Sequence, residues 1–166
     1  MVSKRLSVSI SLILASFCTC VGQSNSSGAV SISANVIRGI VITNSTNLAF
    51  GTLVSGSGTQ SVSPTEPGVG SFTFSGQPGS NVSVTFPNNV ILTDGSGHSV
   101  AFNPAIPIWN NANSQLLGAQ PFSGITGGSV GLGAAGQVFV WFGGGINTNG
   151  ATSGNYSGNY TVDITY

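Results

Sequence analysis

The chain has 166 residues, of which only 4% are charged, and its formal net charge at pH 7 is zero. Three Lys and Arg residues provide no basic surface for nucleic acid or for an anionic lipid membrane, so we expect neither as a partner. Gly, Ser, Thr, Asn and Gln must therefore form the solvated surface. This composition favours an external structural or adhesive protein over a soluble cytoplasmic one.

The first 22 residues have the layout of a secretory signal peptide. Lys4 and Arg5 precede a short apolar run, and small residues follow at Cys20 and Gly22. We expect cleavage after Gly22, with cleavage after Cys20 as the alternative, and the apolar run is too short for a transmembrane helix. The sequence therefore predicts a secreted protein, in the periplasm during transit and then at the cell surface or outside the cell, with no integral membrane span after cleavage.

Beyond the signal peptide, the sequence predicts one all-β domain. Short period-two apolar runs are separated by turn residues, and no stretch of ten residues carries a helical apolar stripe. No charge shift or proline linker marks a second domain, so we expect residues 23–166 to form a single antiparallel β-sandwich. Both cysteines, Cys18 and Cys20, lie in the signal peptide, so we expect no disulfide in the mature chain.

The first expected strand covers residues 29–36. Its alternating residues, which would line one face of the strand, are Val30, Ile32, Ala34 and Val36. Alternation alone allows two interpretations: the strand pairs within its own sandwich, or it is a donor strand added to the sheet edge of another subunit. Donation would build a fibre through head-to-tail contacts that do not close.

Several strands are expected in the first half of the remaining chain. The clearest inward-facing residues are Phe72 and Phe74, followed by Val82, Val84 and Phe86. Residues 90–102 indicate a hairpin whose turn is Asp94-Gly95-Ser96-Gly97, with His98 at an exposed strand start.

Residues 104–136 show no sustained period, and we expect one or two irregular strands and long loops there. An exposed Trp109 is the candidate ligand contact, because an aromatic face beside amide groups suits a sugar. The neighbouring amides are Asn110, Asn111, Asn113 and Gln115. Residues 137–142 are apolar at both parities, which indicates a strand covered on both faces with Trp141 in the core. Gly143-Gly144-Gly145 is expected to end that strand.

The last strand has the most regular pattern. Tyr160, Val162, Ile164 and Tyr166 share one parity, and the polar residues between them share the other, as in a half-buried strand. Terminal residues fray unless another element holds them, so we expect this strand to be paired on at least one side. It is the candidate assembly strand, whose apolar face a chaperone strand would help to bury before assembly.

Groups that could support catalysis are few. Beyond residue 22 the chain has one His, no Cys, no Lys and three carboxylates. Asp94, His98 and one of the many serines could form a triad on paper, but the nucleophile elbow is missing, so turn chemistry is favoured. The one carboxylate of the Asp94 turn also disfavours a calcium site. We therefore expect no enzyme activity, no metal and no cofactor.

Five ordered segments resemble one protein family. They are residues 47–51, 70–79, 82–87, 142–145 and 154–162. In this order and spacing the chain resembles the domain-of-unknown-function family numbered 4402, found in secreted proteins of Gram-negative bacteria and related to fimbrial-type subunits. Residues 103–136 do not match closely. The resemblance implies an immunoglobulin-like β-sandwich and an exported structural role.

More distantly, the chain resembles the pilin subunits assembled by the chaperone–usher route. Those subunits have an alternating terminal strand with a tyrosine, and an N-terminal extension that completes a neighbour's sandwich. Many also have an early disulfide, which this chain could not form after cleavage. We therefore expect a structural or adhesive fimbrial (pilus) subunit whose partners are other subunits, a periplasmic chaperone and an usher. The alternative is a secreted monomeric binding module for a glycan or host protein.

Overall fold

The computed structural model describes residues 31–166, so the expected signal peptide and Val30 lie outside the described residues. Val36–Tyr166 forms one compact unit, and residues 31–35 are the described part of a separate unit. Residues 31–40 form no strand. Ala34 is exposed, and the side chains of Ile32 and Val36 are 94% and 91% exposed. The described apolar side chains of the expected first strand therefore lie in solvent.

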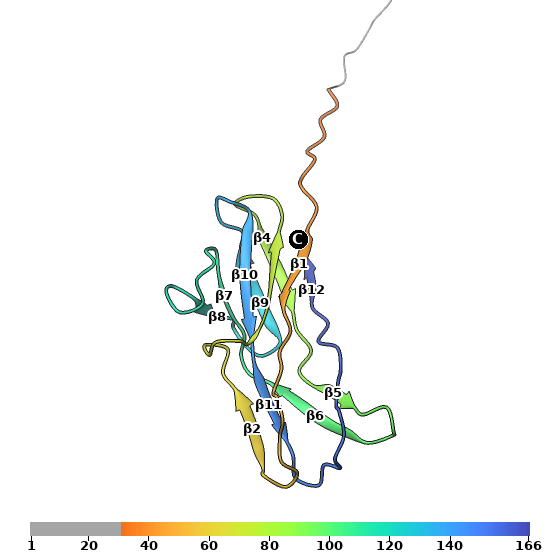
Figure 1. Cartoon of the computed structure of the whole chain (residues 1–166). Helices are drawn as coiled ribbons and strands as arrows, with labels where there is room; N and C mark the ends of the chain where they lie inside the picture. The colour runs from red at the N-terminus through yellow and green to blue at the C-terminus, as the bar shows by residue number, and fades with distance from the viewer. Residues whose placement is uncertain (1–30) are drawn as a thin grey trace, which may run out of the picture. The chain divides into compact units, whose positions relative to one another are not determined.

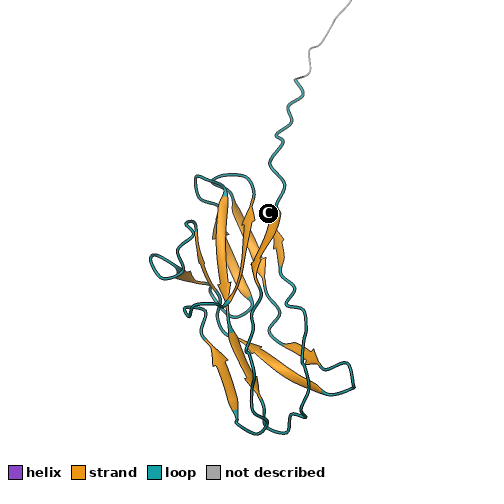
Figure 2. Cartoon of the chain, in the orientation of Figure 1, coloured by secondary structure: helices purple, strands orange, loops and turns teal. Residues whose placement is uncertain are grey.

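Residues 31–166 contain strands and loops and no helix, so no helix in this part of the chain could cross a membrane (Figures 1 and 2). In chain order the strands are β1 (Val41–Thr46), β2 (Thr59–Val62), β3 (Gly70–Ser75), β4 (Asn81–Thr85), β5 (Val90–Thr93), β6 (Ser99–Pro104), β7 (Ile108–Asn110), β8 (Gln120–Pro121), β9 (Gly127–Gly131), β10 (Gln137–Phe142), β11 (Gly144–Asn147) and β12 (Asp163–Thr165). They pair antiparallel in three sheets, ordered β1-β3-β10-β7-β8, β2-β11-β6-β5 and β12-β4-β9. The expected all-β antiparallel sandwich is confirmed.

The main core lies between the five-stranded and the three-stranded sheets. Alternate residues of a strand point to opposite faces, so one parity of each central strand is buried. The buried residues of these strands are Phe72 and Phe74 of β3, Val82 and Val84 of β4, Val130 of β9, and Val138 and Val140 of β10. Burial of each such side chain stabilises the fold by about 1.5–3 kcal/mol. The inward-facing positions predicted for β3 and β4 are confirmed.

β10 ends at Phe142, directly before the three glycines, as expected. Two of these glycines, Gly144 and Gly145, begin β11, a strand of another sheet. β11 pairs with β2 and β6 of the four-stranded sheet. A Cβ on Gly143 would lie 2.2 Å from the carbonyl oxygen of Val62, and one on Gly144 would lie 2.5 Å from that of Asn103. The glycines therefore allow the chain to cross between sheets with its backbone packed directly against neighbouring backbone.

The middle of the chain contains one strand more than expected. The β5–β6 hairpin is confirmed, with Thr93 paired to Ser99 across the Asp94 turn. Residues 104–136 contain three strands, β7, β8 and β9. β9 pairs along its whole length with β4 although it has little apolar pattern, because three of its five residues are glycine. Its pairing partner determines its structure, so its own sequence gave little signal.

The terminal strand is paired, as expected, but it is shorter than its pattern suggested. Asp163, Ile164 and Thr165 of β12 pair with Thr85, Val84 and Ser83 of β4. The ladder ends at Asp163, opposite Thr85, and two residues beyond Thr85 the partner chain reaches Pro87, which has no N–H to donate. The predicted alternation is nevertheless present: Tyr160, Val162 and Ile164 are half-buried and the residues between them are exposed.

Candidate functional site

A groove of about 1140 Å³ opens between two distant segments of the chain. One wall is the segment after β1, from residue 46 to residue 55, and the other is the segment before β12, from residue 151 to residue 162. Among the strands of residues 31–166, β1 and β12 are edge strands, since each is paired on one side only. We call this hollow the terminal groove. Its two walls are joined to the edge strands β1 and β12 but, beyond Thr46, lie outside the sheet ladders of the described residues.

The first wall has the alternation of a strand but forms no ladder. Leu48 and Phe50 are half-buried and pack against a small second core, whereas Asn47 and Ala49 are exposed. Residues 47–58 belong to no strand. Sequence reasoning missed this wall as a functional element, although Leu48 and Phe50 were a visible period-two pair.

The second wall is fixed to the end of the β5–β6 hairpin. Ser157 and Thr93 exchange two backbone hydrogen bonds of 2.9 and 3.0 Å. Gly158 lies so close to β5 that a Cβ there would be 2.8 Å from the carbonyl oxygen of Ile91. The close approach of Gly158 and the backbone pair at Ser157 together hold this wall in place.

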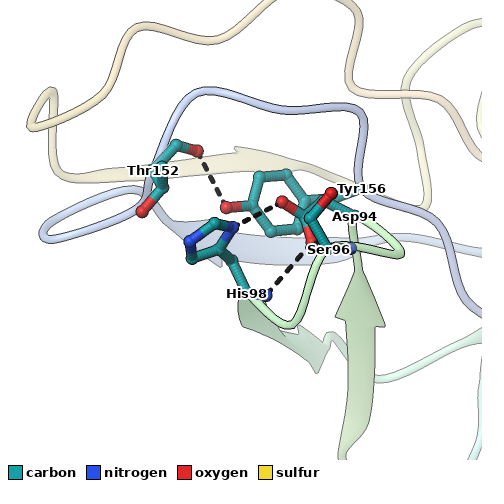
Figure 3. A network of polar contacts seen from close by, with 5 residues as sticks. All are labelled: Asp94, Ser96, His98, Thr152 and Tyr156. Atoms are coloured by element: carbon teal, nitrogen blue, oxygen red, sulfur yellow. Dashed lines mark hydrogen bonds and ion pairs between the residues drawn. The ribbon is translucent and has the colours of Figure 1, made fainter.

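Asp94 organises the hairpin turn beneath the second wall (Figure 3). Its Oδ1 accepts hydrogen bonds from the backbone N–H groups of Ser96 at 2.8 Å and His98 at 3.1 Å, and its Oδ2 lies 2.6 Å from His98 Nδ1. The hydrogen bond with the His98 side chain, followed by that from Ser96, lowers the pKa of the Asp94 carboxyl. Across the turn, the Tyr156 hydroxyl donates to the carbonyl of Thr152 at 2.8 Å.

This polar cluster has a structural explanation and lacks the arrangement of a catalytic triad. Within residues 31–166, no serine hydroxyl hydrogen-bonds to His98, and no group of three His, Cys, Asp or Glu side chains is placed to hold a metal ion. The contacts of Asp94 are those of a residue that closes a turn on its own backbone.

Tyr160 forms the aromatic floor of the terminal groove, where the two cores meet. Its ring stacks on Phe142 at 4.8 Å and on Phe86 at 6.0 Å, and meets Phe102 edge-on at 6.0 Å. Its hydroxyl is buried without a hydrogen-bond partner among the described residues. Desolvation raises the pKa of this hydroxyl well above its ordinary value. The floor is therefore apolar, with one polar atom left unsatisfied.

The chemistry of the terminal groove suits an uncharged, apolar segment. None of the described residues that line it is charged. Its floor is aromatic and aliphatic, and its rim carries Ser, Thr and Asn side chains. Such a surface gains free energy by excluding water from apolar area rather than by pairing charges.

The predicted assembly residues do not all meet at one place. Tyr160 and Val162 line the terminal groove, whereas Ile164 packs against the main core. Tyr166 is 47% exposed and lies near the start of β1, where its hydroxyl contacts Arg38. The predicted donor residues Ile32, Ala34 and Val36 are exposed, as described above.

Trp109 is not the exposed residue that we expected. It lies in β7, is half-buried, and packs against the main core with its ring centroid 6.5 Å from that of Phe122. The amides of Asn110, Asn111 and Gln115 donate to backbone carbonyls and so brace the surrounding loops. A ligand role for Trp109 stays a prediction, and packing explains the residue without one.

These features define a class: a β-sandwich with an open groove whose described lining residues are uncharged and lie mainly in two segments beside its strands. Residues 40–166 match the family model described as Domain of unknown function (DUF4402), so the chain belongs to this family, as its sequence had suggested. No curated protein matched the chain. Two of the five segments that carry the resemblance, residues 47–51 and 154–162, form the facing walls of the terminal groove.

Proposed function

We propose that the protein is an exported structural subunit of a surface fibre, in which residues 29–36 of one copy fill the terminal groove of the next. The observation that carries the proposal is the open groove between the segment that follows β1 and the segment that precedes β12. In β-strand addition, backbone hydrogen bonds provide affinity and pockets for alternate side chains provide specificity. A groove with a period-two apolar wall meets both requirements.

The donor segment and the groove match in length and chemistry. Eight extended residues span about 27 Å at 3.3–3.4 Å per residue, and the two walls comprise residues 46–55 and 151–162, so each has at least as many residues as the donor segment. Neither residues 29–36 nor the groove carries a charge. Ile32 and Val36 are almost fully exposed, and burial of each would contribute about 1.5–3 kcal/mol.

The open edge also bears on the proposed partners and route. In β1, Val41 is 59% exposed and Ile42 is 49% exposed, and an apolar edge strand of this kind pairs readily with other chains. A subunit in transit would need this edge covered, so a periplasmic chaperone and an outer-membrane usher are the proposed partners. Other copies or related subunits are the partners in the final assembly. The proposal includes no catalytic activity.

Crosslinking between copies tests the proposal. In a Cys18→Ser/Cys20→Ser background, one copy carries Ile32→Cys and a second carries Leu48→Cys. A short thiol crosslinker should join the two copies into a mixed dimer. Ser33→Cys is the matched control, because its side chain points to the opposite face of the donated strand.

Two results would contradict the proposal. The first is equal crosslinking yield from positions 32 and 33, which would show that no face of the segment is buried. The second is a chain that light scattering finds monomeric at every concentration. Ile32→Asn provides a second check and should reduce assembly at least about tenfold, because it places a polar side chain on the apolar floor.

A further inference from the structure

Three residues form a clamp at the base of the N-terminal extension. The backbone N–H of Arg38 donates to the side-chain oxygen of Gln77 at 3.2 Å, and the backbone N–H of Gln77 donates to the Tyr166 hydroxyl at 2.7 Å. That hydroxyl donates to the carbonyl of Arg38 at 2.5 Å. Both backbone polar groups of Arg38 are thus bound. Figure 1 shows the C-terminus beside the start of β1.

The position of Tyr166 in the clamp depends on its packing. A Cβ on Gly76 would lie 2.6 Å from the Tyr166 hydroxyl, so the tyrosine reaches Arg38 across a space that only glycine leaves open. The clamp therefore links three segments that are distant in sequence: the chain before β1, the turn after β3, and the residue that follows β12.

Two segments with the same sequence could fill the terminal groove: residues 29–36 of the chain itself, or residues 29–36 of another copy. The clamp matters because it bears on which of them does. The first wall of the groove begins at Thr46, where β1 ends, so a chain that filled its own groove would have to fold its extension back alongside β1 toward that wall. Such a hairpin needs a turn of about two to five residues, which would fall within residues 36–40. Arg38 would then have to give its backbone groups to the turn or to a new ladder, and the clamp bonds would break.

We propose that the Arg38–Gln77–Tyr166 clamp keeps residues 29–36 from completing their own sandwich, so that the extension is available only to another copy. Tyr166 is a positioning residue in this device: its hydroxyl contacts Arg38 and Gln77, not the occupant of the groove. The inference rests on the proposed function, because it concerns which copy supplies the strand.

The test measures the ratio of crosslinks within one chain to crosslinks between chains. Full-length protein in the Cys18→Ser/Cys20→Ser background carries both Ile32→Cys and Leu48→Cys, so either kind of link can form. Tyr166→Phe keeps the ring but removes both hydrogen bonds of the hydroxyl, and it should raise the ratio about tenfold. Gln77→Ala removes only the acceptor of the Arg38 N–H and should raise it about threefold.

Ser123→Ala is the matched control, because it removes a hydroxyl that donates to the Gly127 carbonyl, and neither residue lines the terminal groove or belongs to the clamp. Its ratio should equal that of the parent protein. A merely structural role for Tyr166 would lower the melting temperature without changing the ratio among folded molecules. An unchanged ratio in folded Tyr166→Phe and Gln77→Ala overturns the clamp proposal alone. A parent protein that forms no links between copies overturns the proposed function and the clamp proposal with it.

Discussion

Replacement of Tyr160 by Phe should stabilise the sandwich. The ring keeps its contacts with Phe142, Phe86 and Phe102, whereas the buried hydroxyl that has no partner among the described residues is removed. An unsatisfied buried polar group costs about 1–3 kcal/mol, and because the Tyr160 side chain is only half-buried we expect a gain of about 1 kcal/mol. In a unit of this size, that corresponds to a rise in melting temperature of roughly 3–5 °C.

The assay is urea unfolding of Tyr160→Phe and the parent protein at neutral and at alkaline pH. Burial raises the pKa of Tyr160 in the folded state above its ordinary value of 10.0, so the folded state holds this proton more tightly than the unfolded state. The resulting stability is present below pH 10 and is lost as the pH rises toward the folded-state pKa. The parent should therefore lose stability at high pH relative to Tyr160→Phe.

A loss of more than 1 kcal/mol at neutral pH in Tyr160→Phe would refute this reasoning, because it would mean that the hydroxyl makes a favourable contact. Tyr160→Ala calibrates the assay. It removes three aromatic contacts and should cost about 3–5 kcal/mol, as in large-to-small core substitutions.

Three further predictions concern the sites described above. Trp109→Ala should lower the free energy of unfolding by about 2–3 kcal/mol in urea titrations, because the ring packs on the core. Loss of glycan-array binding in a variant with unchanged stability would instead favour a ligand role for Trp109. Gly144→Ala should cost about 3 kcal/mol through its clash with the backbone of β6, whereas Gly39→Ala, with no atom within 4 Å of its Cβ, should be close to neutral by thermal melting. Because the pKa of Asp94 is lowered in the folded state, its contribution to stability is present above its ordinary pKa of 3.8 and is lost as the pH falls through the folded-state pKa. NMR should therefore show the hairpin turn loosening at that lower pH in the parent protein but not in Asp94→Asn.

The sequence predicted the strands whose two faces have different environments. Phe72 and Phe74 alternate with Ser and Thr because β3 is buried on one side, so the period-two pattern carries the fold directly. The same rule fails for β9, where glycines contribute little pattern and pairing with β4 determines the structure. It also fails at Gly144, because crowding by a distant strand cannot be read from neighbouring residues.

The terminal groove and the clamp lay beyond prediction for a common reason. The alternation of Leu48 and Phe50 indicates an inward face, but whether a strand lies beside them depends on which edges the sheets leave unpaired. The alternation predicted an inward face for Tyr166, but the residue follows β12 and is 47% exposed. Its hydroxyl partners, however, lie 89 and 128 residues away in the chain, and no local pattern encodes such a contact.

The clamp has one more consequence, which concerns proteolysis. Arg38 is the single Lys or Arg residue in residues 31–166, so a trypsin-like protease has one cleavage position in this part of the chain. Proteases act on backbone that can leave its surroundings and enter their active site. The peptide bond after Arg38 begins with the carbonyl that Tyr166 holds, and its cleavage would separate the extension from the sandwich. The rate of tryptic cutting at this bond therefore reports how often the clamp opens, without any label or substitution.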